Sequence, residues 1–357
     1  MASEAVMLTV GTREVRISSP SRVLWPELGI TKLDLAKYLS EENVGPAFIA
    51  ANGDRPLSLQ RFPGGIDGEQ FFSKNPPKGA PDYVGSVSVV YPSGRTHPQL
   101  VLDEPAAVVW AAQMNAVVFH PWPSRARDTD NPDQLRIDLD PQPGTDFDDA
   151  IPAALELRKV LEEAGLEAFV KTSGNRGLHV FAPIEPTREF LDVRHAVIGA
   201  ARELERRMPR KVTTNWWKEE RGERIFVDFN QANRDRTMAG AYSPRALPTA
   251  TVSTPLEWDE LGNADPAAHT ILTVPERLAT VGDPWARFGA APGTIDVLLG
   301  WWDRDLENGL GELPFPPDYP KMPGEPPRVQ PSRARWSLEN RASDSATPAP
   351  TEPAREG

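Results

Sequence analysis

The sequence predicts a mixed α/β protein, of the α+β kind, built around one regular unit in the middle of the chain. Apolar residues alternate with polar ones over short stretches there, recur at helical spacing between those stretches, and are separated by turn residues. The resulting order of strand, helix, two strands, helix and strand is that of the RRM-like unit.

The N-terminal part, about residues 1–130, is predicted to be a mixed α/β unit. Thr31 is a suitable N-cap for a helix whose apolar side includes Leu35 and Leu39. A second helix is expected over 104–113, where Pro105 suits the first turn. Alternating apolar residues predict strands over 8–10, 14–17, 56–62, 69–73 and 86–91.

The regular unit occupies about residues 131–305, so that 1–305 form the folded domain. The pattern predicts strands over 134–139, 168–172, 178–182 and 225–229, helices over 147–164, 187–208 and 294–304, short strands around 249–251, and a helix-like stretch from residue 265. Residues 306–330 are expected to form a proline-rich strap and 331–357 a disordered tail, because their composition buries too little apolar surface to offset the entropy of ordering.

Composition argues against several classes of protein. The chain has no cysteine, which excludes disulfides, thiolate metal sites and a cysteine nucleophile. We expect a cytoplasmic protein with no membrane contact, because neither a signal peptide nor a long apolar span is recognisable. The 51 acidic residues exceed the 39 Lys and Arg residues, and the net charge of −12 argues against nonspecific coating of nucleic acid. A local basic site remains compatible with this charge.

Three acidic residues are the first candidates for chemistry. Asp138 and Asp140 alternate with apolar residues, so in a strand both carboxylates project from one face and suit divalent cations. Asp228 lies in a strongly apolar run, where a carboxylate requires a partner or a metal. Taken alone, the pair is also typical of exposed aspartates at a strand end, and Asp228 of a capping or hydrogen-bonded residue.

A turn between two predicted strands has the composition of a phosphate cradle. Gly174 and Gly177 let the backbone bend and present N–H groups, while Ser173, Arg176 and His179 supply polar side chains. The turn is not a Walker A motif, because the Gly-Lys-Ser/Thr ending is absent. A tight hairpin without a ligand is the alternative.

Polar residues after the third acid extend this pattern. Gln231, Arg234, Arg236 and Arg245 follow closely, and clustered arginines suit a triphosphate, although a solvated loop is the alternative. His120 ends an apolar stretch, where a packed histidine is the common case.

Together these motifs resemble the polymerase domain of bacterial ATP-dependent DNA ligase D, within the archaeo-eukaryotic primase superfamily. The runs 138–141, 172–180 and 226–231 are similar to motifs I, II and III of that family. The likeness covers about residues 8–305 and includes 23–26, 29–32, 71–76 and 120–122. The run 215–224 is similar to the stand-alone actinobacterial members of the family.

The resemblance implies a primase-polymerase fold and a set of site residues. Two divalent metal ions are implied, with Mn²⁺ expected and Mg²⁺ as the alternative. Arg176 and Arg22 stand where many relatives carry Lys, which changes the geometry of a phosphate contact. The implied residues are Asp138, Asp140 and Asp228 for catalysis and the metals; Ser173, Arg176, His179, Gln231, Arg245 and His120 for the nucleotide; Arg22 and Lys32 for a 5′-phosphate on DNA; and Phe71 and Phe72 for stacking at a gap or duplex end.

The implied activity is template-directed nucleotidyl transfer, in which a primer 3′-hydroxyl attacks an incoming NTP or dNTP at gaps or broken DNA ends during repair. Ribonucleotides are expected to be preferred. No Lys-x-Asp-Gly motif of nucleotidylating ligases occurs, so a separate DNA ligase and the end-binding protein Ku are implied as partners. Two alternatives stay open: a catalytically weak module that binds or bridges DNA ends, and a metal phosphoesterase that uses the same acids.

Overall fold

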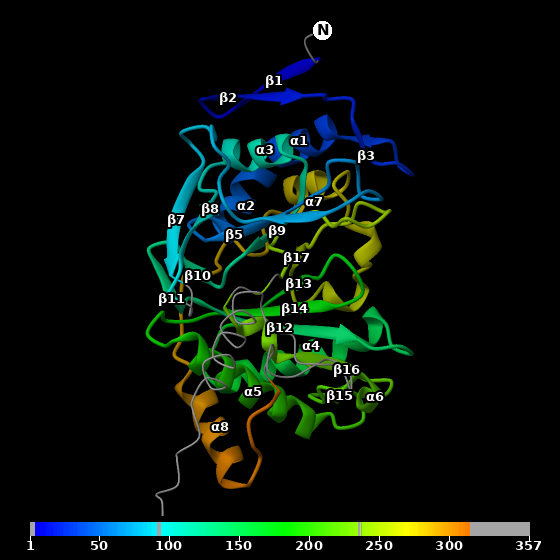
Figure 1. Ribbon diagram of the computed structural model, residues 1–357. Helices are drawn as coiled ribbons and strands as arrows, with labels where there is room; N and C mark the ends of the chain where they lie inside the picture. The colour runs from blue at the N-terminus through cyan, green and yellow to red at the C-terminus, as the bar shows by residue number, and fades with distance from the viewer. Residues whose placement is uncertain (1–3, 91–93, 235, 237, 315–357) are drawn as a thin grey trace, which may run out of the picture.

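The computed structural model describes residues 4–90, 94–234, 236 and 238–314, which form two stacked α/β units (Figure 1). The predicted tail over 331–357, and the predicted strap beyond residue 314, lie outside the described residues. None of the helices in the described ranges has the length and apolarity needed to cross a bilayer.

The N-terminal unit contains a sheet in the order β6-β5-β8-β7, with β9 also paired to β5. Thr31 caps the first helix as predicted, since its side chain accepts the backbone N–H of Asp34. The elements are β1 (Ala5–Val10), β2 (Arg13–Ser18), β3 (Val23–Trp25), β4 (Ile30–Thr31), α1 (Lys32–Ser40), α2 (Val44–Asn52), β5 (Leu57–Arg61), β6 (Phe71–Ser73), β7 (Gly85–Val90), β8 (Thr96–Val101), α3 (Pro105–Gln113), β9 (Ala116–Pro121), β10 (Ser124–Arg125) and β11 (Asp128–Pro132).

The second unit confirms the predicted RRM-like order. Its sheet runs β15-β16-β12-β14-β13-β17, so the four predicted strands lie in the order fourth, first, third, second, each antiparallel to the next of the four, while β15 is parallel to β16. The elements are β12 (Gln134–Pro141), α4 (Phe147–Glu163), β13 (Phe169–Thr172), β14 (Leu178–Pro183), α5 (Phe190–Arg207), β15 (Val212–Thr213), α6 (Lys218–Arg221), β16 (Ile225–Asp228), the 3₁₀ turn η1 (Phe229–Ala232), β17 (Pro255–Leu256), α7 (Val274–Val281) and α8 (Asp296–Glu307). The helix-like stretch expected from residue 265 is a single 3₁₀ turn, Pro266–Ala268, and α7 begins only at Val274.

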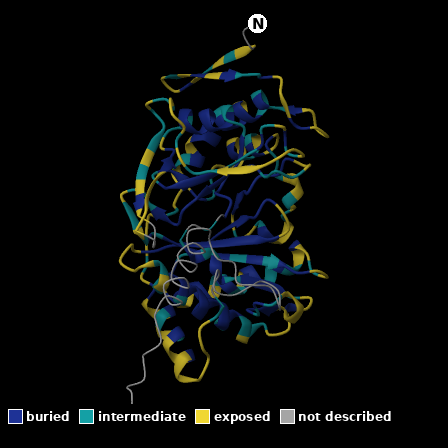
Figure 2. Ribbon diagram, in the orientation of Figure 1, coloured by how far each residue is buried: buried dark blue, intermediate teal, exposed yellow. Residues whose placement is uncertain are grey.

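The two faces of the second sheet have different roles. Alternate residues such as Ile137, Val170 and Val180 belong to a hydrophobic cluster with α4 and α5. The opposite face contributes Phe169 and Phe181 to the cluster of the N-terminal unit, which also contains side chains from the segment 238–285 (Figure 2). Polar residues of this face therefore lie between two buried layers. The division of the domain near residue 130 stays a prediction.

A buried ion pair joins the two units where the chain passes into β12. Arg55 is fully buried, and its Nη1 and Nη2 donate to the two carboxylate oxygens of Asp133 at 2.5 and 2.8 Å. Arg125 adds a third bond, from Nε to Asp133 at 2.6 Å. Burial alone would raise the pKa of Asp133, but Arg55 and Arg125 outweigh it and hold this pKa below its ordinary value.

We expect Asp133→Asn to lower the free energy of unfolding by about 3–5 kcal/mol, because it leaves the buried Arg55 without its anion. The folded-state pKa of Asp133 is depressed, so its contribution is present above the unfolded pKa and is lost as the pH falls through the folded value. Urea unfolding at pH 7 and at acidic pH measures both effects. The exposed Asp67→Asn is the control, and equal stability of the two variants would contradict the assignment.

Candidate active site

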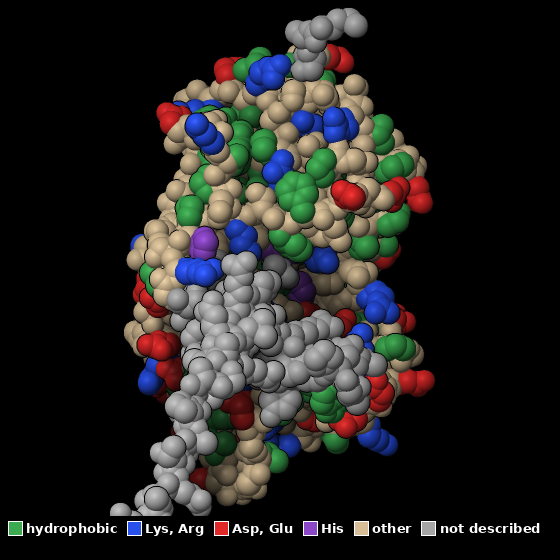
Figure 3. All heavy atoms as spheres, viewed as in Figure 1, with side chains coloured by type: hydrophobic (Ala, Val, Ile, Leu, Met, Phe, Trp, Pro, Cys, Tyr) green, Lys and Arg blue, Asp and Glu red, His purple; other side chains and the backbone are tan. Residues whose placement is uncertain are grey.

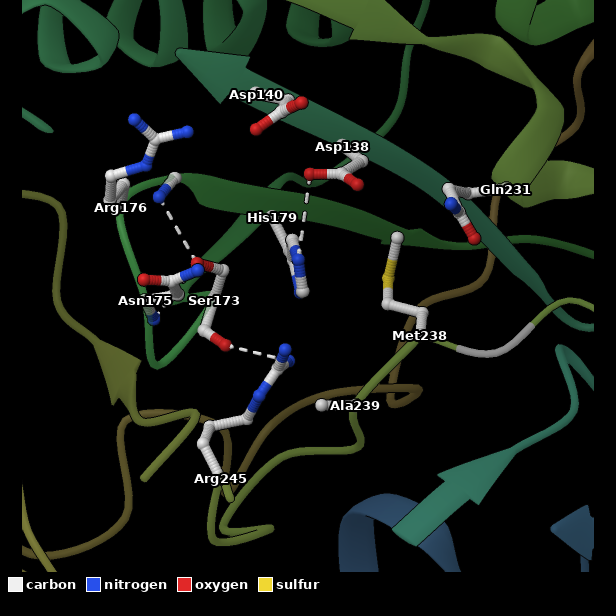
Figure 4. Close-up of a pocket in the computed structure, with 11 residues that line it drawn as sticks. Asp138, Asp140, Ser173, Asn175, Arg176, His179, Gln231, Met238, Ala239 and Arg245 are labelled. Carbon is white, nitrogen blue, oxygen red and sulfur yellow. Dashed lines mark hydrogen bonds and ion pairs between the residues drawn. The ribbon is translucent and has the colours of Figure 1, made fainter. Parts of the chain in front are cut away.

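Strand order brings residues of all three motifs to one place on the sheet. Asp138 of β12 lies directly opposite Asp228 of β16 on one side and His179 of β14 on the other. Asp138 and Asp140 project into a single cavity, which Figure 4 shows with the residues of the phosphate turn on one side of the two acids. The cavity is lined by Asp138, Asp140, Ser173, Asn175, Arg176, Gly177, His179, Gln231, Met238, Ala239 and Arg245.

The carboxylates repel one another. Burial raises the pKa of Asp138 well above its ordinary value, and the nearby charges of Asp228 and Asp140 raise it further. Burial also raises the pKa of Asp140, against a hydrogen bond from Gln142. In the described part of the chain, no Lys or Arg nitrogen lies within 4.0 Å of these carboxylates, and the imidazole Nε2 of His179 is 3.5 Å from Asp138. The cluster therefore carries negative charge without a direct cationic partner.

The donor set suits a hard divalent cation, because carboxylate oxygens in mutual repulsion gain most from one. Among the described residues, however, no three His, Asp or Glu side chains already stand together as a metal site. Asp228 is turned toward η1, where its two oxygens accept the backbone N–H of Asn230 at 3.1 Å and Nε2 of Gln231 at 3.0 Å. Asp138 and Asp140 thus share the cavity, and Asp228 borders it from the next strand.

The predicted phosphate turn is preorganised. The hydroxyl oxygen of Ser173 accepts the N–H groups of Asn175 and Gly177, both at 3.1 Å, and Arg245 donates to the Ser173 carbonyl at 3.0 Å. Gly174 has φ +71°, and a Cβ there would lie 2.6 Å from the Arg245 side chain, so glycine is required. The Ser173 hydroxyl proton stays available to a ligand.

Lys171 is a site residue to which sequence analysis assigned no role. Its amino group is fully buried beneath His179 and donates to Nδ1 of that ring at 2.6 Å, to the Ala239 carbonyl at 2.9 Å and to Ser253 Oγ at 2.5 Å. Burial and the charges of Arg245 and Arg136 lower the pKa of Lys171 well below its ordinary value. Because Nδ1 accepts, the ring proton is on Nε2, which faces Asp138. Burial and the charge of Lys171 lower the pKa of His179, so the ring is neutral. The position of this lysine in an otherwise apolar strand is the sequence signal that could have indicated its role.

Two further residues that were predicted to contact the nucleotide lie at the edge of the site. Gln231 lines the cavity, and its buried Oε1 has no hydrogen-bond partner among the described residues. His120 is buried 5.5 Å from the ring of Phe72, and burial together with Arg245 lowers its pKa to about 3. Arg234 does not join Arg245, since it instead pairs with Asp130 and donates to the Thr129 carbonyl.

The predicted DNA-contacting residues lie on the N-terminal unit. Phe71 and Phe72 of β6 are 44% and 50% exposed, which is unusual for large apolar side chains. Lys32 is largely buried, donates from Nζ to the Ser18 carbonyl at 2.8 Å, and has a pKa lowered to about 8 by burial and by Arg22. In Figure 3, basic and histidine side chains gather at the waist between the two units.

An RRM-like sheet with paired acids beside a glycine-containing phosphate turn defines the protein as one of the primase-polymerase class. The chain belongs to the LigD primase-polymerase domain family, whose profile matches residues 31–285. The resemblance found in the sequence is thereby confirmed.

Similar proteins agree with this assignment. The chain is 32% identical over 292 residues to the multifunctional non-homologous end joining protein LigD of Pseudomonas aeruginosa, covering 81% of this chain and 34% of that protein. It is 29% identical over 287 residues to the bifunctional LigD of Bacillus subtilis, covering 78% and 45%. The chain therefore spans less than half the length of these relatives. The polymerase domain of Mycobacterium tuberculosis ligase D, solved with DNA, matches with a TM-score of 0.70, 30% identity and coverage of 77% of this chain and 98% of that one.

We expect Asp138→Asn to raise the thermal unfolding midpoint when divalent ions are absent, by about 2–4 °C for each kcal/mol of repulsion removed. The folded-state pKa of Asp138 is raised, so its favourable contribution is confined to low pH and is lost as the pH rises through that value. Calorimetry at neutral pH with a chelator measures the shift, and the exposed Asp259→Asn is the control. A lower midpoint for Asp138→Asn would show that the carboxylates do not repel.

Proposed function

We propose that this protein is a template-directed polymerase that extends a primer 3′ end at gaps or broken DNA ends in repair, with two divalent metal ions. The observation that carries the proposal is that one cavity joins the acids of β12 to the phosphate turn. Acids that suit metals and donors that suit phosphate are what nucleotidyl transfer requires together. The relatives are non-homologous end joining proteins, which supports the repair setting.

Asp138 and Asp140 would hold the ions, with Asp228 as the further carboxylate, and Mn²⁺ is the expected ion. Bound ions supply the positive charge that stabilises the entering and leaving oxygens. The chain itself supplies the remaining contacts: the hydroxyl of Ser173 and the guanidinium of Arg176 face the cavity that the triphosphate would occupy. The Nε2–H of His179 is a neutral donor beside them, which binds phosphate oxygen without neutralising the acids.

The preference for ribonucleotides is supported by the unpaired Oε1 of Gln231. A ribose 2′-hydroxyl can donate to a buried acceptor that a deoxyribose leaves unpaired, and such an unpaired group costs about 1–3 kcal/mol. His120 is a neutral ring that lies near Met238 and Arg245 of the cavity.

On the DNA side, Phe71 and Phe72 would stack on the bases at a gap, while Arg22 and Lys32 would bind a 5′-phosphate. We infer that a separate DNA ligase seals the product and that Ku holds the ends, as the resemblance to the ligase D polymerase domains implies; the matched relatives are named as end-joining proteins.

Primer extension on gapped DNA tests the proposal. Wild-type protein should extend the primer, better with NTP than dNTP and with Mn²⁺ than Mg²⁺. The double variant Asp138→Ala, Asp140→Ala should fall to background but still bind gapped DNA, because Lys32 and Phe71 lie on the other unit. Extension by the double variant would refute the metal assignment; DNA binding without wild-type extension would favour an end-binding module, and primer shortening a phosphoesterase.

Recognition of the 5′-phosphate gives a second test. A gap with a 5′-phosphate should be bound about tenfold better than one with a 5′-hydroxyl, since a charge-assisted contact contributes about 1.5–3 kcal/mol. Lys32→Ala should erase most of this difference, whereas Lys37→Ala, exposed on the same helix, should not. The preference should decline as the pH rises through about 8, where free Lys32 loses its proton. Fluorescence anisotropy measures both, and equal wild-type affinity for the two gaps rejects the assignment.

A further inference from the structure

The chain turns back after α8 and lies along α5. Residues 309–314, here called the α5 strap, are tied down at successive points. The backbone N–H of Leu310 donates to the Asp305 carbonyl at 2.9 Å, and Arg202 donates to the Gly311 carbonyl at 2.5 Å. Glu312 pairs with His195 at 2.7 Å. The strap lies beyond residues 31–285, which the family profile matches.

One buried cation connects the strap to the candidate site. Arg194 of α5 is 1% exposed and donates from Nη1 to Glu312 at 2.5 Å and from Nη2 to the Leu313 carbonyl at 2.8 Å. Its Nε donates in the other direction, to the side-chain oxygen of Asn230 at 3.2 Å, and its guanidinium lies 5.4 Å from the ring centre of Phe229. The same group therefore contacts both the strap and η1.

The connection continues to the third acid. Asn230 donates its backbone N–H to Asp228 at 3.1 Å and its side-chain N–H to the Pro314 carbonyl at 3.2 Å. Asn230 is thus fixed on two sides by Arg194 and the strap while it holds a carboxylate oxygen of Asp228. The next residue, Gln231, holds the other oxygen at 3.0 Å.

We propose that Arg194 is a positioning residue for Asp228 and that the α5 strap, through Glu312, holds Arg194 in this role. Attachment of the strap alone would not need Asn230, because Arg202 and His195 already tie it to α5. The hydrogen bonds that Arg194 and the Pro314 carbonyl form with Asn230 instead fix η1, the turn that follows Asp228. The coupling between strap and turn stands on these contacts, and its effect on catalysis rests on the proposed function.

Hydrogen exchange of the full-length protein, followed by mass spectrometry, tests the coupling without reference to activity. Glu312→Ala should raise the equilibrium constant for local opening of residues 225–233 about tenfold, because Arg194 loses its charged acceptor. The exchange of the peptides that cover these residues reports this constant. Glu312→Gln keeps an acceptor oxygen and should have a smaller effect. The control is Glu307→Ala, at an exposed position at the end of α8, and β13 and β14 should keep their protection in every variant. Arg194→Lys, which has one nitrogen in place of the fork, should match Glu312→Ala.

Catalysis gives the second readout. In Glu312→Ala we expect Mn²⁺ to bind several-fold more weakly by calorimetry and kcat to fall, with gapped-DNA affinity unchanged. Unchanged exchange over 225–233 in both Glu312→Ala and Arg194→Lys would overturn the proposal. So would an equal rise in exchange over β13 and β14, which would indicate general destabilisation. A wild-type protein that neither binds Mn²⁺ nor extends primers would instead refute the proposed function, and the exchange pattern would still decide the role of the strap.

Discussion

The site depends on placing the carboxylates of Asp138, Asp140 and Asp228 on two neighbouring strands without a direct cationic partner among the described residues. Each is contacted by a neutral group of a residue that also contacts a buried basic side chain: the imidazole of His179, the side-chain amide of Gln142 and the backbone N–H of Asn230. The relays are Asp138 with His179 and Lys171, Asp140 with Gln142 and Arg221, and Asp228 with Asn230 and Arg194. Lys171, Arg221 and Arg194 are all at most 5% exposed, so each cation needs its acceptors as much as the acids need the relay.

A direct ion pair shifts the pKa of a carboxylate in the opposite direction, and the same protein contains such a pair at Asp133. Asp133 meets two arginines directly, its pKa is held below the ordinary value, and its oxygens are occupied. Among the described residues, the carboxylate of Asp138 meets the imidazole of His179 at 3.5 Å and no Lys or Arg nitrogen, and its pKa is raised. A neutral group placed between a carboxylate and a basic side chain orients the carboxylate without forming an ion pair with it. The carboxylate oxygens then stay available to an external cation. The first arrangement stabilises the fold, and the second costs stability in favour of binding.

Most of the fold could be predicted because apolar and polar residues alternate in its strands or recur at helical spacing in its helices. The alternation in β12 and the helical spacing in α4 and α5 are of this kind, and so is the cap of α1 at Thr31. The helix α2 and the strand β9 were not predicted. β9 is buried along its whole length, and the exposed positions of α2, Pro46 and Ala50, are themselves apolar, so neither element shows a period that separates helix from strand. The return of the segment 238–285 to the N-terminal cluster depends on long-range packing, which no local pattern reports.

The candidate site, too, could be predicted from the sequence only where a local pattern was present. Alternation placed Asp138 and Asp140 on one face, and the order of strands then made Asp228 and His179 their neighbours. Of the supporting basic residues, Lys171 alone had a sequence signal, whereas Arg221 and Arg194 are recognised only by the acceptors that they contact in the fold. Arg194 lies on a helix whose charged residues suggest a solvated side, and the glutamate that it binds is 118 residues away. Local sequence therefore specifies which groups act, whereas the tertiary fold specifies what holds them, and the precision of the site is a property of distant segments.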